Sequence, residues 1–214
     1  MKVLVAAASK HGATDEIAVA VADVLAQHGL DVRLVPADDV ESVRGCDAVV
    51  LGSAVYMGRW LEAARRLVDA HADELSAVPV WLFSSGPVGD PPRPADDQAV
   101  DVTEIVAATR ARGHRLFAGK LDRESLGFGE RALVRALGVR DGDYRDWDVI
   151  RGWAAEIADA LRASRRTNRP RRDPRRDARR GAASSSARPE GSSLPVRACR
   201  SGRSARKLCR ARGS

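Results

Sequence analysis

Cysteine is scarce in this 214-residue chain, which has only Cys46, Cys199 and Cys209. An odd number of widely spaced cysteines offers neither a disulfide framework nor the paired spacing of a metal site. It predicts a protein of the reducing cytoplasm. The sequence also lacks any run of eighteen apolar residues, so we expect no membrane-spanning helix. The apolar start at 2–8 is short for an export segment and is soon followed by charged residues. We interpret it as a buried strand.

Acidic residues are scarce toward the end of the chain, so the formal net charge of +7 describes neither the first 163 residues nor the remainder. Residues 164–214 hold 17 of the 36 basic residues and 3 of the 29 acidic ones, which gives them +14 and leaves −7 for residues 1–163. The basic segment has almost no large apolar side chains with which to offset the entropy of ordering. We predict a folded acidic domain over 1–163 and a disordered arginine-rich tail over 164–214.

The tail also lacks aromatic residues, which argues against stacking on single-stranded nucleic acid. We therefore expect no specific nucleic-acid partner. Its charge makes it a candidate for weak contact with an anionic membrane, where each basic residue near the surface contributes about 1 kcal/mol. A tail without any selected function is the alternative. These expectations place the protein in the cytoplasm, at the membrane periphery if the tail binds there.

Apolar runs alternate with helical patterns along the first 163 residues. The expected strands cover 2–8, 31–34, 48–51, 78–83 and 115–118. The expected helices cover 17–25, 61–68, 100–112, 129–137 and 147–161. Most strands are apolar throughout, as in a parallel sheet covered on both faces, whereas 31–34 alternates like an edge strand. The pattern predicts a doubly wound α/β fold, with a five-stranded parallel sheet in the order 2-1-3-4-5 and helices on both faces.

The loop that joins the first strand to the first helix has the properties of an anion site. It reads Ser9-Lys10-His11-Gly12-Ala13-Thr14. Such a turn directs backbone N–H groups and the positive end of the helix dipole toward a bound anion. Gly12 lets the backbone approach closely, and the hydroxyls of Ser9 and Thr14 can donate. The loop lacks both the Walker A ending and the Gly-x-Gly-x-x-Gly fingerprint. We predict a phosphate site; a structural helix cap at Thr14 is the alternative.

Two further loops follow the third and fourth strands. They read Ser53-Ala54-Val55-Tyr56-Met57-Gly58 and Ser84-Ser85-Gly86-Pro87-Val88-Gly89. In open α/β sheets, ligands bind outside the carboxyl ends of the strands, at the switch point between the first and third strands. All three loops are expected at that edge. Together they suit a flat ring attached to a phosphate.

These motifs resemble the flavodoxin superfamily over about residues 1–163. Within it, the chain is most similar to the flavodoxin-domain family that includes the menaquinone-dependent protoporphyrinogen oxidases. The resemblance also rests on 117–121 and 142–147, and 119–142 resembles an insertion near the fifth strand in that family. It implies a flavodoxin-like fold and one noncovalent FMN. By this resemblance, the loop 9–14 would hold the phosphate, and 53–58 and 84–89 would flank the isoalloxazine ring.

Two departures from the flavodoxin pattern bear on function. His11 stands where typical flavodoxins carry Thr or Ser, although a histidine can still donate to a phosphate. The loop 84–89 has no aromatic residue, whereas many shuttle flavodoxins enclose the ring between two aromatics. Tyr56 would then cover one face and leave the other open. An open face favours an FMN oxidoreductase with a quinone or a redox partner protein, and with a porphyrinogen as a candidate substrate.

Other interpretations of the same residues remain open. The first is an electron-transfer protein with no small-molecule substrate, and the second is a binding module that has lost FMN through His11. A signalling receiver would need acidic residues where the first and third strands end, and the chain has Ser9 and Ser53 there. We nominate no catalytic acid or base, because a flavin supplies its own chemistry. The aspartates of 143–148 are interpreted as caps and solvated side chains rather than as a metal cluster.

Overall fold

The computed structural model describes residues 1–86, 88, 100–122, 124, 126–127, 129, 131 and 140–167. The chain divides into two units, Met1–Arg169 and Pro170–Ser214. The first contains the α/β fold, and the second lies outside the described residues. The predicted tail therefore falls outside them too, except for 164–167, which belong to the last helix. None of the described helices is both long and apolar enough to cross a membrane.

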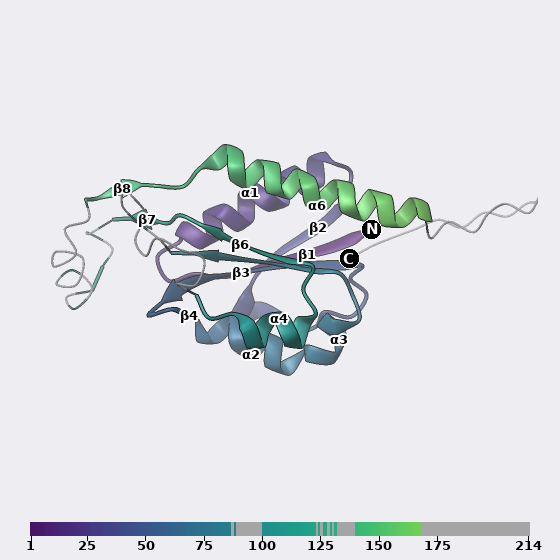
Figure 1. The fold of residues 1–214 in the computed structure, drawn as a ribbon, viewed down its shortest axis with the longest axis horizontal. Helices are drawn as coiled ribbons and strands as arrows, with labels where there is room; N and C mark the ends of the chain where they lie inside the picture. The colour runs from purple at the N-terminus through teal and green to yellow at the C-terminus, as the bar shows by residue number, and fades with distance from the viewer. Residues whose placement is uncertain are drawn as a thin grey trace, which may run out of the picture. The chain divides into compact units, whose positions relative to one another are not determined.

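A parallel sheet forms the centre of the first unit (Figure 1). Its strands are β1 (Lys2–Ala8), β2 (Asp31–Pro36), β3 (Ala48–Tyr56), β5 (Val80–Ser85) and β6 (Gly113–Phe117). They are hydrogen-bonded in the order β2-β1-β3-β5-β6, and each of these pairs is parallel. With β5 and β6 as the fourth and fifth long strands, this is the predicted order. The structure confirms the flavodoxin-like doubly wound fold.

Two short antiparallel pairings lie beside this sheet. Strand β4 (Arg59–Trp60) pairs with the end of β3, and β7 (Lys120–Leu121) pairs with β8 (Gly142–Asp143) in a separate ladder. In Figure 1, β4, β7 and β8 all lie toward the side of the sheet where the first helix begins. These short strands therefore border the carboxyl edge of the long strands.

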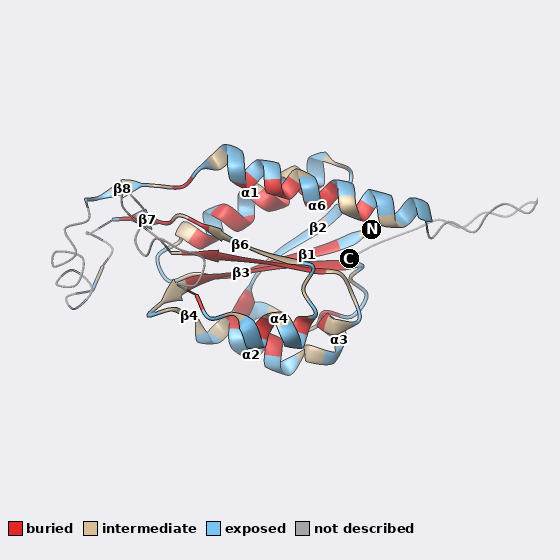
Figure 2. Cartoon of the chain, viewed as in Figure 1, coloured by how far each residue is buried: buried red, intermediate tan, exposed pale blue. Residues whose placement is uncertain are grey.

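Helices cover both faces of the sheet. They are α1 (Ala13–Gln27), α2 (Glu62–Ala70), α3 (Ala72–Ser76), α4 (Thr103–Thr109) and α6 (Trp147–Thr167), with a short 3₁₀ turn at Ala37–Asp39. Figure 1 shows α1 and α6 on one face and α2, α3 and α4 on the other. Figure 2 shows that the buried residues of these helices face the sheet. The spacing of apolar residues along each helix produces this arrangement, because it places them on one side.

Each face of the sheet has its own hydrophobic core. On the α1 and α6 face, Phe83 packs edge-on against Trp153, with ring centroids 6.0 Å apart. On the other face, Leu51 and Leu82 pack with residues of α2 and α4. Strand β2 is more exposed along its length than the central strands, as predicted for an edge strand. The core thus fixes the strands whose ends carry the three loops.

Some predicted boundaries were wrong. The range 100–112 is not one helix, because α4 ends at Thr109 and Arg110 takes a left-handed conformation (φ 50°) before β6 begins. The expected loop 53–58 instead continues β3 and turns back into β4. Helix α3 was not predicted at all. The expected helix at 129–137 lies almost wholly outside the described residues.

Candidate functional site

The three predicted loops come together at one edge of the sheet. Ala8, at the end of β1, is in register with Ser53 of β3, and Ser53 is in register with Ser84 of β5. Since these strands are adjacent and parallel, the segments that follow them lie side by side. The fold therefore assembles the predicted site from residues distant in sequence.

Residues 9–14, the predicted phosphate loop, lead directly into α1, with Gly12 as the N-cap. Gly12 is left-handed (φ 82°, ψ −19°), a conformation that glycine adopts without strain. It has no side chain with which to cap the helix, so the first N–H groups of α1 have no capping acceptor from the residue before them. Thr14 is buried inside the first turn and is not the cap. The alternative interpretation, a structural cap at Thr14, is therefore wrong.

Asp15 adds a carboxyl group to this loop. The residue is exposed as a whole, yet its surroundings partly shield the carboxyl from water, and this burial raises the pKa of Asp15. A hydrogen bond from the Ser9 side chain offsets part of this rise in the pKa of Asp15. The hydroxyl of Ser9 is thus engaged by the carboxyl of Asp15, in the first turn of α1. The negative charge of Asp15 opposes the binding of an anion at the same turn.

The second loop forms the tip of the β3–β4 hairpin. Met57 and Gly58 both have positive φ, 51° and 76°, as in a two-residue turn that matches the twist of the flanking strands. Tyr56 lies just before the turn. The ammonium of Lys10 lies 4.9 Å from the centroid of the Tyr56 ring, and the ring of His11 lies 6.5 Å from it. The phosphate loop and the second loop therefore meet at Tyr56.

Two serines of the predicted site turn their hydroxyls toward the protein interior. The hydroxyl of Ser53 accepts a bond from the N–H of Leu61 (2.9 Å) and donates to the carbonyl of Ala54 (2.8 Å). The hydroxyl of Ser84 accepts a bond from the indole of Trp60 (2.7 Å) and lies 2.7 Å from Nε2 of a histidine in β6, His114. Both serines are fully buried. Their hydroxyls hold the hairpin and β6 in place. Any ligand at this edge would therefore contact the backbone and the neighbouring residues rather than these two hydroxyls.

The third loop leaves β5 at Gly86, whose N–H donates to the carbonyl of Phe117. A β-carbon at Gly86 would lie 3.1 Å from that of Val55, and one at Gly119 would lie 3.4 Å from the carbonyl oxygen of Gly86. The second and third loops and the start of the 119–142 segment are therefore closely packed. Of the predicted residues of this loop, Pro87 and Gly89 lie outside the described part.

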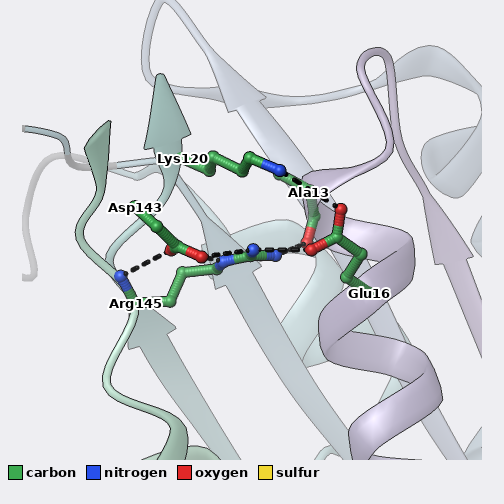
Figure 3. A network of polar contacts seen from close by, with 5 residues as sticks. All are labelled: Ala13, Glu16, Lys120, Asp143 and Arg145. Carbon is green, nitrogen blue, oxygen red and sulfur yellow. Dashed lines mark hydrogen bonds and ion pairs between the residues drawn. The ribbon is translucent and has the colours of Figure 1, made fainter. Parts of the chain in front are cut away.

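Sequence analysis missed Arg145, which bonds to a residue of the predicted phosphate loop and whose side chain is only 1% exposed. Figure 3 shows its guanidinium between the first turn of α1 and β8. It donates to the carbonyl of Ala13 (2.8 Å), to Glu16 (2.6 Å), and to both carboxylate oxygens of Asp143 (2.8 and 2.7 Å). Lys120 lies 3.6 Å from Glu16. We call Glu16, Lys120, Asp143 and Arg145 the Arg145 network.

The network consists of charged groups that stabilise one another. Hydrogen bonds from Arg145 lower the pKa values of Glu16 and Asp143, although partial burial opposes the shift in both. Burial alone would lower the pKa of Arg145, but its bonds to Asp143 and Glu16 raise it overall. All three groups therefore remain charged at neutral pH. The motif 142–147 was noticed in the sequence, but nothing in it indicates a partner 132 residues away.

The other aspartates of this segment have the roles predicted for them. The carboxylate of Asp146 accepts bonds from the N–H groups of Asp148 and Val149 (both 3.0 Å), which caps α6. Across the described ranges, no group of three metal-binding side chains occurs. A pocket of about 420 Å³ is lined by Asp143–Asp148 and by no residue of the three loops. Its three carboxylates do not suit a phosphate.

Comparisons with known proteins agree with this fold. A family profile described as a flavodoxin domain matches residues 4–148. Flavodoxin 1 from Bacillus cereus is 17% identical with a TM-score of 0.52, and the match covers 74% of this chain and 98% of that one. A flavodoxin from Streptococcus pneumoniae TIGR4 is 20% identical with a TM-score of 0.52, covering 77% and 99%.

A third similar structure is the rubredoxin oxygen:oxidoreductase from Desulfovibrio gigas, 14% identical with a TM-score of 0.52, covering 76% of this chain and 36% of that one. At such identities, these likenesses show the fold alone. No curated protein sequence matched the chain. Because the family profile spans most of the folded unit, the chain belongs to the flavodoxin domain family, whose cofactor is FMN.

Proposed function

We propose that this protein is an FMN oxidoreductase that works at the carboxyl edge of its sheet. The observation that carries the proposal is the meeting of the phosphate loop and the second loop at Tyr56, with Lys10 and His11 beside its ring. The ammonium of Lys10, a ring N–H of His11 and the N–H groups of a helix start suit a phosphate, and an aromatic ring suits a flat cofactor. These residues therefore fit FMN.

The division of work between the loops follows from their chemistry. Residues 9–14 would hold the FMN phosphate, and residues 53–58 and 84–89 would border the isoalloxazine ring. When bound, FMN supplies the electron and hydride transfer. The chain supplies the position of the cofactor, the charge around it and the access of other molecules to it. His11 would take part as a donor to the phosphate, in place of the hydroxyl usual in flavodoxins.

Access to the second face of the ring supports an oxidoreductase over a pure carrier. Tyr56 is the one aromatic residue in the sequence of the two ring loops, and the described residues of the third loop are small or aliphatic. We propose that a planar substrate or a quinone approaches the ring from this side. We propose a reaction like that of the menaquinone-dependent protoporphyrinogen oxidases, in which electrons leave a porphyrinogen and reduce a quinone. An electron-transfer protein that serves only a redox partner protein is the alternative.

The cofactor is tested first, by mixing the purified protein with FMN, removing free flavin and recording the absorbance. We expect retained bands at about 370 and 450 nm, set by the flavin itself. The test variant is Gly12→Val, which puts a β-branched side chain at a left-handed position. Its matched control is Gly152→Val on the exposed side of α6, where a β-carbon would have no atom within 4 Å apart from its chain neighbours and the nearby backbone of its own helix. Only the first should lose flavin. A colourless wild type would overturn the proposal.

The reaction is tested second, with the FMN-loaded protein under anaerobic conditions. Turnover of a porphyrinogen with a menaquinone analogue as acceptor would support the oxidoreductase. Tyr56→Ala should then lower turnover, whereas Tyr144→Ala, whose hydroxyl bonds to the carbonyl of Arg140 in the 140–147 segment, should not. Electron exchange with a reductase protein but with no small molecule would identify an electron carrier instead.

The arginine-rich tail supports a second proposal, which concerns the location of the protein. We propose that the protein works in the cytoplasm and that its tail makes weak contact with anionic membranes, where a quinone would be available. The +14 charge of residues 164–214 supports this. Because α6 extends to Thr167, the test is a chain that ends there. Equal sedimentation of the full and shortened chains with anionic vesicles would rule out membrane contact.

A further inference from the structure

Arg145 connects two parts of the molecule that the sequence places far apart. Its guanidinium donates to the carbonyl of Ala13, in the first turn of α1. The same group is held from the other side by both carboxylate oxygens of Asp143 in β8. The centroid of the Trp147 ring lies 4.4 Å from Cζ of Arg145. A side chain held on so many sides has one position, and it fixes the groups that it contacts.

The contact with Ala13 bears directly on the phosphate loop. The carbonyl of Ala13 and the N–H of Thr14 belong to one planar trans peptide, so they point in opposite directions. In a helix, the carbonyl points toward the carboxyl end and the N–H toward the amino end. Arg145 holds the carbonyl, and the N–H of Thr14 is therefore held toward the loop 9–14, where an anion would bind.

Charge attraction to a phosphate is not the role of Arg145. Its hydrogen-bonding groups are engaged by Ala13, Glu16 and Asp143, and its side chain is almost fully buried. The Arg145 network contains two cations and two carboxylates and so has no net charge. Lys10, which is exposed on the phosphate loop, is the residue placed to supply positive charge there. The contribution of Arg145 is therefore geometric.

We propose that Arg145 is a positioning residue for the FMN phosphate: by holding the first peptide of α1, it preorganises the N–H donors of the phosphate loop and links them to β8. This inference rests on the proposed function, because it takes FMN to be the ligand. Preorganisation of this kind strengthens binding by removing the cost of ordering the donors when the ligand arrives. The effect should be confined to ligands that carry the phosphate.

The test compares FMN with riboflavin, which has the same ring system and no phosphate. The variant is Arg145→Gln, and its matched control is Arg162→Gln. Arg162 also joins α6 to α1 by donating to a backbone carbonyl, that of His28, at the opposite end of α1. We expect Arg145→Gln to raise the FMN dissociation constant about tenfold or more and to leave that of riboflavin within about twofold. Arg162→Gln should change neither.

Glu16→Gln provides a second variant in case Arg145→Gln folds poorly. The side chain of Glu16 is half exposed, so its replacement leaves the core intact while removing the negative charge that strengthens its bond with the guanidinium. We expect a smaller loss of FMN affinity, about threefold, again without an effect on riboflavin. Circular dichroism and the thermal midpoint, measured without flavin, show whether each variant is folded at the temperature of the titration.

Each outcome decides the matter. Weaker FMN binding with unchanged riboflavin binding supports the positioning role. Equal weakening of both flavins, or no change in either, would overturn it while leaving the proposed function intact, since the wild type still binds FMN. A wild type that binds neither flavin would overturn the proposed function and this inference together.

Discussion

At the scale of single residues, Gly52 shows how closely the sheet is packed beneath the site. A β-carbon at Gly52 would lie 2.0 Å from Cζ of Phe83, whose ring is fully buried and packs against Trp153. The ring has nowhere to move without disturbing the core of the α1 and α6 face. We expect Gly52→Ala to lower the free energy of unfolding by about 1–3 kcal/mol, measured by urea denaturation.

The control for Gly52 is another glycine where space is free. Gly152 lies in α6 and is exposed, and a β-carbon there would have no atom within 4 Å apart from its chain neighbours and the nearby backbone of its own helix. Gly152→Ala should raise the free energy of unfolding by about 0.5–1 kcal/mol, because alanine is the better helix former. Equal effects of the two substitutions would show that the close contact at Phe83 does not control stability.

Asp15 is a second residue whose environment makes a prediction. Burial raises the pKa of Asp15 in the folded protein, so its favourable contribution exists below the unfolded pKa and is lost as pH rises through the folded pKa. At neutral pH, Asp15 is therefore unfavourable for both folding and anion binding. We expect Asp15→Asn to raise the thermal midpoint and to tighten FMN binding by up to about fivefold, measured by fluorescence titration.

Asp23→Asn is the matched control for this prediction. Asp23 lies on the same helix, is exposed, and stands more than two turns beyond Asp15. The charge change is identical, but Asp23 is far enough from the phosphate loop for salt to screen the electrostatic interaction between them. Tighter FMN binding in both variants would mean that net charge, rather than the position of Asp15, controls affinity.

At the scale of elements, the Arg145 network joins α1 to β8, and its stability depends on pH. The hydrogen bonds of Arg145 lower the pKa of Asp143 below its ordinary 3.8. Its stabilising contribution is therefore full above the unfolded pKa and is lost as pH falls through the folded pKa. Asp143→Asn should lower the free energy of unfolding by about 1–2 kcal/mol at pH 7, allowing for partial exposure of the carboxylate.

The pH series distinguishes this ionic role from simple packing. The difference between wild type and Asp143→Asn should shrink steadily as the pH is lowered below about 3.8. Asp148→Asn, with an exposed carboxylate 3.6 Å from Arg151, serves as the control and should cost little at any pH. A constant difference for Asp143→Asn across the whole series would contradict the ionic explanation.

Sequence patterns predicted the elements that local physics controls. The long strands were found because continuous apolar runs require cover on both faces, and β2 was found as an edge because its polar residues face solvent. The β3–β4 hairpin was missed, since the pairing of Tyr56 with Arg59 leaves no apolar alternation to detect. Arg145 was missed because its role depends on a contact with Ala13, and no local pattern reports a contact across 132 residues.

At the scale of the whole molecule, the chain joins an acidic folded unit to a basic segment, and we expect its stability and its FMN binding to depend on the folded unit alone. Both hydrophobic cores, the Arg145 network and the described residues of the three loops all lie within Met1–Arg169. A chain that ends at Arg169 should therefore keep the thermal midpoint and the FMN dissociation constant of the full chain, as measured by calorimetry and fluorescence titration. Removing so much positive charge should also shift the isoelectric point from about 10.0 to an acidic value.

Weaker FMN binding by the shortened chain would mean that the basic segment contributes charge to the phosphate site. If that weakening disappeared in high salt, the contribution would act through the electrostatic field rather than through a direct contact.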